Sequence, residues 1–192
     1  GPRAVAIDAA GNVYVTDTGN KRIQVFDAQG NFLTQYGGGG VVEGRFDEPV
    51  GLAIAPRDDG QPGGMLYVAD TWNRRIQKLD VGVDELLSGS GEGRDLVISF
   101  VKEWPVEGWN SQSVVNKPFV AVDSTGTVYA TDPEGFRVLA WDSEGQFKAT
   151  FGLYGSDAQS FALPNGIAVG PDDRVYVADA DNHRVMVFPA VR

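Results

Sequence analysis

The stretch VYVTDTGNKRIQVF at residues 13–26 recurs three more times along the chain. The other copies read LYVADTWNRRIQKL at 66–79, VYATDPEGFRVLAW at 128–141 and VYVADADNHRVMVF at 175–188. In each copy an apolar, alternating segment leads to an Asp, and a second such segment follows an Arg. Alternation with a period of two predicts a β-strand, so each copy predicts a β-hairpin.

Further strand-like segments flank these copies. Small apolar segments precede them at 5–7, 52–54, 120–122 and 167–169, and alternating segments follow the first and third at 32–36 and 147–151. A unit of four short strands is typical of a β-propeller blade. We therefore predict an all-β propeller region with blades at about 1–40, 46–116, 117–155 and 163–192, and an insertion at 81–116 that contains a candidate outer strand at 96–101.

The fourth unit has no evident outer strand, because only four residues follow the segment 185–188. Two arrangements stay open: four blades that close as they stand, or an incomplete ring that a partner chain or further blades would complete. Open sheet edges favour pairing with another chain.

The segments DTGNKRIQVF at 17–26 and DADNHRVMVF at 179–188 resemble the NHL repeat, a family of six-bladed propellers. The order EWPVEGW at 103–109 and VNKP at 115–118 is also similar to the NHL region of large bacterial membrane proteins of glycosyltransferase type. That finer resemblance implies an extracellular or cell-surface location in bacteria. The family resemblance implies a platform for interactions.

Composition narrows the classes of partner and chemistry. The chain has 192 residues and a net charge of −10, which disfavours nucleic acid because phosphate binding requires basic residues. No apolar stretch approaches the ~20 residues of a membrane span. The sequence has no Cys and one His, which excludes thiolate chemistry and centres with several histidines. We expect no cofactor; calcium is the remaining candidate, although no alternating Asp loop is present.

The most repeated polar element is the loop between the two strands of each hairpin. Asx side chains bond backbone amides in turns, and an Arg five residues after an Asp can pair with it. A site used once need not be copied in every blade, so we interpret this motif as structural. Its members are Asp17, Asn20, Arg22, Asp70, Arg75, Asp132, Arg137, Asp179, Asn182 and Arg184.

Candidates for contact with a ligand or partner are residues that differ between copies. Trp72 occupies a loop position held by Gly19 in the first copy, and an exposed Trp can stack on a sugar or anchor a protein. The alternative for every tryptophan is packing, which we favour for Trp104 and Trp109. The remaining candidates are the loop residues Asn73, Arg74 and His183.

Three functions follow from these observations. The first is a non-catalytic scaffold that binds a protein or a glycan through loops on one face. The second is a propeller enzyme of lyase or lactonase type with a metal on the axis. The single His, at a position that varies between copies, leads us to expect that the chain is not an enzyme. The third is an assembly module that completes a ring by self-association or with parts of a longer protein.

Overall fold

The computed structural model describes residues 1–58, 60–84, 96–109 and 116–192, and it contains four antiparallel sheets in chain order. The first comprises β1 (Pro2–Ile7), β2 (Val13–Asp17), β3 (Arg22–Phe26) and β4 (Phe32–Gly37). The second comprises β5 (Pro49–Pro56), β6 (Gly64–Asp70), β7 (Arg75–Val83) and β8 (Leu96–Pro105). We call these sheets blades 1 and 2.

Blade 3 comprises β9 (Val120–Val122), β10 (Val128–Asp132), β11 (Arg137–Trp141) and β12 (Phe147–Phe151). Blade 4 has three strands, β13 (Pro164–Val169), β14 (Val175–Asp179) and β15 (Arg184–Phe188). Short 3-10 turns, η1 (Thr18–Asn20) and η2 (Ala180–Asn182), follow the second strands of blades 1 and 4. The all-β architecture with four blades confirms the fold predicted from the repeats.

Part of the predicted insertion at 81–116 is regular sheet. β7 extends to Val83 and β8 runs from Leu96 to Pro105, and the two strands pair over this whole length. The hairpin formed by the third and fourth strands of blade 2 is therefore longer than its equivalents. Residues 85–95 and 110–115 of the predicted insertion lie outside the described residues.

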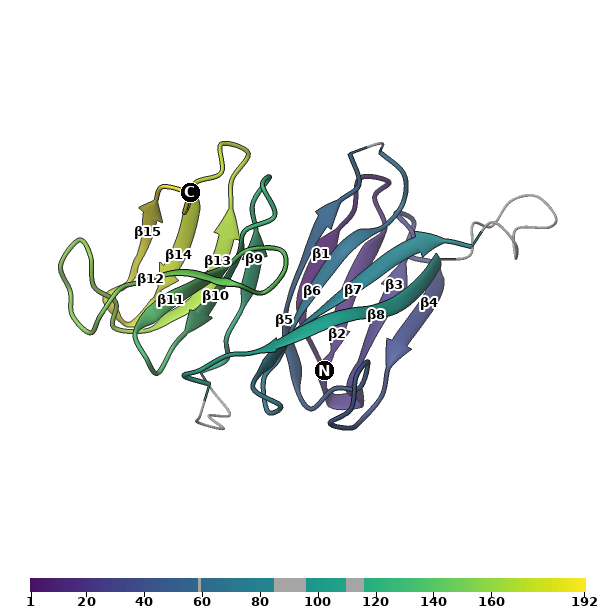
Figure 1. Cartoon of the computed structure of the whole chain (residues 1–192), viewed down its shortest axis with the longest axis horizontal. Coiled ribbons are helices and arrows are strands. Elements are labelled where there is room, and N and C mark those ends of the chain that lie inside the picture. Colours follow the sequence, from purple (N-terminus) through teal and green to yellow (C-terminus); the bar gives the residue numbers. More distant parts are fainter. Residues whose placement is uncertain (59, 85–95, 110–115) are drawn as a thin grey trace.

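The strand registers place equivalent loops at one end of every blade. In blade 1, Pro2 pairs with Asp17, Asp17 with Arg22, and Arg22 with Gly37. The hairpin loop between the second and third strands and the linker to the next blade therefore leave from the same end. We call this end the linker face; it lies at the bottom of Figure 1 and contains η1.

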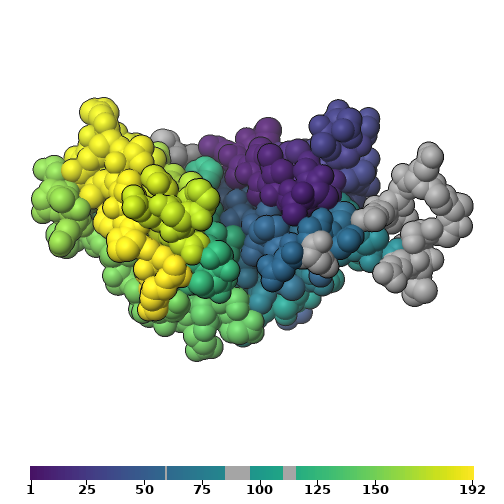
Figure 2. Space-filling view, turned by 90° about the horizontal axis from the view of Figure 1, so that it is seen from above, coloured from purple at the N-terminus to yellow at the C-terminus, as the bar shows by residue number. Residues whose placement is uncertain are grey.

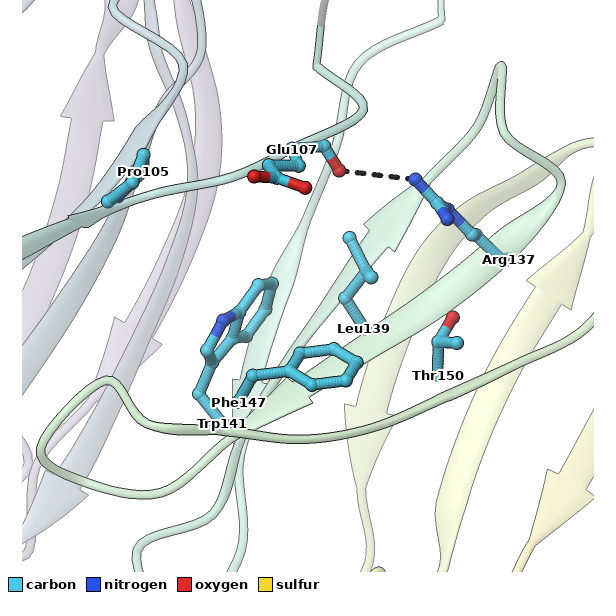
Figure 3. A pocket seen from close by; sticks show the side chains of 7 residues that line it. All are labelled: Pro105, Glu107, Arg137, Leu139, Trp141, Phe147 and Thr150. Atoms are coloured by element: carbon cyan, nitrogen blue, oxygen red, sulfur yellow. Dashed lines mark hydrogen bonds between the residues drawn. The ribbon is translucent and has the colours of Figure 1, made fainter.

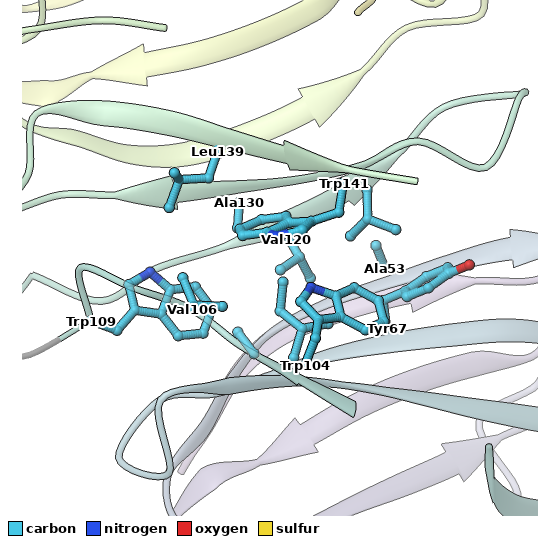
Figure 4. Packing of buried hydrophobic residues seen from close by; sticks show 12 residues of the cluster. Ala53, Tyr67, Trp104, Val106, Trp109, Val120, Ala130, Leu139 and Trp141 are labelled. Atoms are coloured by element: carbon cyan, nitrogen blue, oxygen red, sulfur yellow. The ribbon is translucent and has the colours of Figure 1, made fainter. Parts of the chain in front are cut away.

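The hydrophobic cores lie between neighbouring blades. Tyr14 and Ile23 of blade 1 pack with Leu66 of blade 2, and a second cluster joins Tyr67 of blade 2 to Trp141 of blade 3. Figure 4 shows this second cluster, and a third joins blades 3 and 4. Because each blade buries one side against the next, the blades follow one another around an arc, in which the purple N-terminal and yellow C-terminal blades reach the same side of Figure 2.

Candidate functional site

The repeated Asp and Arg form an ion pair in each of the four blades. The Arg Nε lies 2.8 to 3.0 Å from an Asp Oδ2 in every copy. The register explains this contact, since the Asp ends the second strand, the Arg begins the third, and the two residues are directly opposed. In blades 1, 2 and 4 the loop Asn also donates to the same carboxylate at 2.7 to 2.8 Å.

The hydrogen-bond donors of Arg75 are all occupied by contacts within the protein. Its Nε donates to Asp70, and its Nη atoms donate to the Glu103 carboxylate and to the carbonyl oxygens of Val41, Val42 and Arg45. A guanidinium has five N–H donors, so this side chain has no donor left for a ligand. The Arg therefore ties the linker that precedes its blade to the hairpin loop.

Arg184 repeats the arrangement in blade 4. It donates to the carbonyl oxygens of Ser156, Asp157 and Ser160 at 2.7 Å, besides pairing with Asp179. Burial would raise the pKa of Asp179, but hydrogen bonds from Asn182, from backbone amides and from Arg184 hold that pKa below its ordinary value. Asp70 behaves differently, because burial raises its pKa against the hydrogen bonds that its carboxylate accepts.

The loop position of His183 has the same left-handed backbone conformation in all four blades. Its equivalents Lys21, Arg74 and Phe136 all have left-handed φ angles, between 53° and 56°, and His183 has 52°. Side chains of four different types occupy this one conformation. His183 is exposed on blade 4 and Arg74 is exposed on blade 2, so the structure does not bring these two candidates into one site.

Trp72 lies at the linker face of blade 2 with 36% of its surface exposed. Its backbone N–H donates to the Asp47 carbonyl at 3.0 Å, and the Lys117 Nζ lies 5.4 Å from the centroid of its ring. Lys117 is itself buried and pairs with Glu48 at 2.7 Å. A buried ammonium requires a partner, and an aromatic face attracts it further. The indole is thereby held by groups beneath it while part of it faces solvent.

Glu48 and Lys117 were not among the residues proposed from sequence, although a signal for them exists. Each directly precedes the proline that leads into the inner strand of its blade, Pro49 or Pro118. Equivalent positions in neighbouring blades thus carry opposite charges, and packing of the blades brings them together.

Asn73 and Arg74 share the loop with Trp72. The Asn73 Nδ2 donates to Asp70 at 2.8 Å and to the Gly40 carbonyl at 2.9 Å, which ties the loop to the preceding linker. The Arg74 carbonyl accepts the Val106 N–H at 2.9 Å. Two linkers therefore meet at this loop and fix its backbone.

Trp104 and Trp109 lie in the core between blades 2 and 3. They are 5% and 4% exposed, so neither presents a surface to a partner. Trp104 packs edge-on against Tyr67, and the Trp109 Nε1 donates to the Thr131 carbonyl at 3.1 Å. Figure 4 shows both indoles among the apolar side chains that join the two blades.

A groove between blades 2 and 3 was not predicted. It encloses a cavity of about 350 Å³ lined by Pro105, Glu107, Arg137, Leu139, Trp141, Phe147 and Thr150. Figure 3 shows its aromatic floor and the hydrogen bond from Arg137 to the Glu107 carbonyl at 3.2 Å. It exists because β8 continues to Pro105 and the chain then crosses to blade 3.

The described part of the chain contains no group of three His, Asp or Glu side chains arranged to hold a metal ion. Likewise, no helix among the described residues has the length and apolar character needed to cross a membrane.

Comparison with known proteins supports the repeat assignment. A family model described as "NHL repeat" matches residues 1–26 and 161–188. NHL repeat-containing protein 2 of Gallus gallus is 27% identical over 97% of this chain and 29% of its own length. A probable peptidyl-alpha-hydroxyglycine alpha-amidating lyase of Caenorhabditis elegans is 24% identical over 89% of this chain and 44% of its own.

Solved structures share the architecture. Virginiamycin B lyase from Staphylococcus aureus superposes with a TM-score of 0.59 at 15% identity, over 98% of this chain and 55% of that one. A chain of the nidogen/laminin complex gives a TM-score of 0.58 at 15% identity, over 98% and 59%. At this identity the likeness establishes the fold alone, and the chain spans little more than half of either structure.

These comparisons correct one expectation. We expected from the single His that the chain is not an enzyme, and this is contradicted because lyases occur both among its sequence relatives and among its structural neighbours. The expectation was drawn from four blades, whereas the two lyases compared above are about twice as long. The finer likeness to bacterial glycosyltransferase-type proteins stays a prediction. The chain contains NHL repeats and folds as a four-bladed β-propeller.

Proposed function

We propose that this chain is a protein-binding module whose contact surface is the linker face of blade 2, centred on Trp72. NHL-repeat proteins mediate protein interactions, and a propeller of similar fold occurs in a complex of nidogen with laminin. The observation that carries the proposal is the support beneath Trp72: an indole 36% exposed, backed by a buried Lys117–Glu48 ion pair.

This support matters because a contact residue that is already ordered loses little conformational entropy on binding. Tryptophan is enriched among the residues that dominate binding energy, and preorganisation lowers the entropic cost of binding. The backbone N–H of Trp72 donates to the Asp47 carbonyl and fixes the loop, and the Lys117 ammonium lies over the indole ring. The same face also offers Arg74, an exposed cation at the next turn of the loop.

Exposed apolar side chains extend the surface beyond Trp72. Val41 and Val42 are 72% and 65% exposed on the linker that precedes blade 2. Arg75 binds the carbonyl oxygens of both valines, so these side chains project from a fixed backbone. A rigid patch of one indole and two valines fits the apolar centre of a protein interface, with charged groups at its rim.

The proposal is tested by selecting binders from a displayed library of protein fragments with the wild-type chain as bait. We expect the selected fragments to lose at least tenfold in affinity for Trp72→Ala and to bind Phe147→Ala normally. Phe147 is a matched control because it is also aromatic and exposed, but it lies in the groove between blades 2 and 3. Fragments that depend on Phe147 and ignore Trp72 would refute the site.

A glycan is the other partner for which an exposed indole is suited. An array of immobilised glycans, probed with the wild type and with Trp72→Ala, separates the two cases. Binding to glycans that Trp72→Ala abolishes would replace the protein partner by a sugar at the same site.

A second function, lyase activity of the whole protein, is favoured by the relatives. The nematode and staphylococcal proteins are lyases, and this chain covers 44% and 55% of them. The direct test is to incubate the protein with a peptidyl-α-hydroxyglycine and measure the peptide amide by mass spectrometry. Turnover above the rate in buffer, and unaffected by Trp72→Ala, would establish a catalytic site separate from the linker face.

A further inference from the structure

The Tyr of the second strand has a fixed partner in blades 1 and 3. The Tyr14 hydroxyl donates to Asp8 at 2.9 Å, and the Tyr129 hydroxyl donates to Asp123 at 2.9 Å. Each Asp directly follows the inner strand of its own blade, at the end opposite the linker face. In both blades the buried hydroxyl is therefore paired with a carboxylate that the same sheet supplies.

Blade 2 has the Tyr but lacks the carboxylate. The position held by Asp8 and Asp123 is Ala55 in this blade. Tyr67 is 1% exposed, and its hydroxyl has no hydrogen-bond partner among the described residues. Figure 4 shows this hydroxyl pointing out of the apolar cluster that surrounds the ring. Burial raises the pKa of Tyr67 to about 12, so the phenol keeps its proton at neutral pH and acts as a donor.

A second departure from the repeat lies directly opposite this Tyr. Tyr67 and Lys78 are register partners, so their side chains lie on the same side of the sheet. The equivalent tyrosines of the other blades are opposed by apolar residues: Val25, Ala140 and Val187. Lys78 is 7% exposed, and its Nζ donates to the Ser143 carbonyl at 2.8 Å and to Glu144 at 3.0 Å. An ammonium has three N–H donors, so one remains beyond these two contacts in the described part of the chain.

Both side chains line a cavity between blades 2 and 3, at the end opposite the linker face. Its volume is about 540 Å³, and Ala55, Tyr67 and Lys78 all belong to its wall. The turn after β9 adds the hydroxyls of Ser124 and Thr125. This volume is in the range of small-molecule sites. Where blades 1 and 3 hold a carboxylate against the Tyr hydroxyl, blade 2 therefore has a short side chain and an open cavity.

We propose that this cavity binds a carboxylate from outside the chain, with Tyr67 and Lys78 as its hydrogen-bond donors. The Tyr67 hydroxyl donates to the bound carboxylate as Tyr14 and Tyr129 donate to their own Asp side chains. Hydrogen bonds to an ionised acceptor are stronger than those between neutral groups. A carboxylate that leaves water also requires a compensating charge, which the buried Lys78 supplies. The carboxylate belongs to a free small acid or to the C-terminus of a peptide, and the test separates these two sources.

The acidic residues around the cavity are occupied or exposed. Asp123 already accepts four hydrogen bonds from residues of its own blade. Asp58 is exposed, and Glu144, with 61% of its side chain exposed, pairs with Lys78 and Lys102. Charges in contact with water are screened. The buried ammonium is therefore the charge that acts most strongly on a ligand in this cavity.

The test is an NMR titration of the chain with two probes, benzoate and N-acetylated trialanine. We expect at least one of them to cause saturable shifts of signals from the cavity. Binding of benzoate identifies a free acid as sufficient. Binding of the peptide alone identifies a peptide C-terminus, and amidation of that terminus should then weaken binding at least about tenfold.

Three variants connect this binding to the named residues. Tyr67→Phe removes only the hydroxyl and should weaken binding at least about tenfold. Tyr14→Phe is the matched control, because it makes the same change in blade 1, where the hydroxyl is bonded to Asp8, and it should leave the affinity unchanged. Ala55→Asp restores the carboxylate found at this position in blades 1 and 3. It should prevent binding of either probe and raise the midpoint of thermal unfolding, and Tyr67→Phe in the same chain should remove that rise.

Three outcomes would overturn the proposal: no saturable shift with either probe, equal affinities of the wild type and Tyr67→Phe, or binding retained by Ala55→Asp. Circular dichroism checks that each variant is folded; if Ala55→Asp does not fold, the comparison of Tyr67→Phe with Tyr14→Phe decides. The cavity lies at the end of the blades opposite Trp72, so Trp72→Ala should bind the probes like the wild type. The outcome is thereby independent of partner binding at the linker face.

Discussion

The ion pairs of blades 1 and 2 have the same sequence motif but different surroundings, and this difference predicts different energies. Asp70 and Arg75 have side chains 0% and 8% exposed, whereas Asp17 and Arg22 are 12% and 33% exposed. Removing one member of a buried pair leaves an uncompensated charge and costs about 3–5 kcal/mol. The blade 1 pair is partly exposed, so its loss should cost less and approach the ~0–1 kcal/mol of surface pairs.

We therefore predict that Arg75→Met lowers the free energy of unfolding by about 3–5 kcal/mol, and that Arg22→Met lowers it by about 1 kcal/mol or less. The larger effect has a second source. Arg75 also holds the carbonyl oxygens of Val41 and Val42, which Met cannot replace. Met preserves much of the length and apolar stem of Arg, so the comparison isolates the charge and its hydrogen bonds.

Urea titrations followed by circular dichroism and by tryptophan fluorescence measure both values. Coincident transitions from the two probes are required, since arrays of repeats can unfold in steps. If Arg75→Met and Arg22→Met lost the same stability within about 0.5 kcal/mol, the assignment of different energies from burial would be refuted.

Three further predictions concern packing and pH. Phe161→Ala leaves a cavity at a fully buried position in the linker before blade 4, so it should lower the free energy of unfolding by about 3–5 kcal/mol. Phe147→Ala removes an exposed ring and should lower it by less than about 0.5 kcal/mol, both measured by urea titration. The pKa of Asp179 is lowered in the folded chain, so its contribution to stability is present above about pH 4 and is lost as the pH falls further. Asp179→Asn should therefore reduce the fall of the unfolding free energy between about pH 4 and lower pH, measured by urea titration at each pH. Burial raises the pKa of Tyr129 to about 12, so its contribution to stability is present below about pH 10 and is lost as the pH rises through 12. Tyr129→Phe should remove this alkaline loss of stability, measured by thermal melts at each pH.

The sequence was sufficient to predict the blades because the repeat determines local structure and register together. The Asp and Arg of each copy are directly opposed at the end of a hairpin, so one motif specifies both the turn and the pairing. The candidate outer strand at 96–101 is confirmed as part of β8, but the continuation of β7 to Val83 and of β8 to Pro105 was not predictable, because these residues read equally well as an insertion. Only their mutual pairing in space shows that they belong to blade 2.

The candidate site was predicted less completely. Trp72 was recognised because it departs from the repeat, but Glu48 and Lys117 lie in linkers whose positions depend on how neighbouring blades pack. Trp104 and Trp109 departed from the repeat as well, yet they are buried. A departure from the repeat marks a residue with a particular role, and only the structure distinguishes a contact residue from one that fastens an irregular linker.

The opposite case is equally informative, because Tyr176 conforms to the repeat and still has a different environment. Its sequence context matches that of Tyr14, Tyr67 and Tyr129, and nothing local predicts that it alone is exposed. Exposure here is a property of the array, set by which blade has a neighbour. The same reasoning separates the exposure of Trp72 from that of Tyr176. Trp72 is exposed on a blade that is covered on both sides, so its exposure belongs to the loop. Tyr176 and Val187 are exposed because no blade of the described residues packs on that side of blade 4.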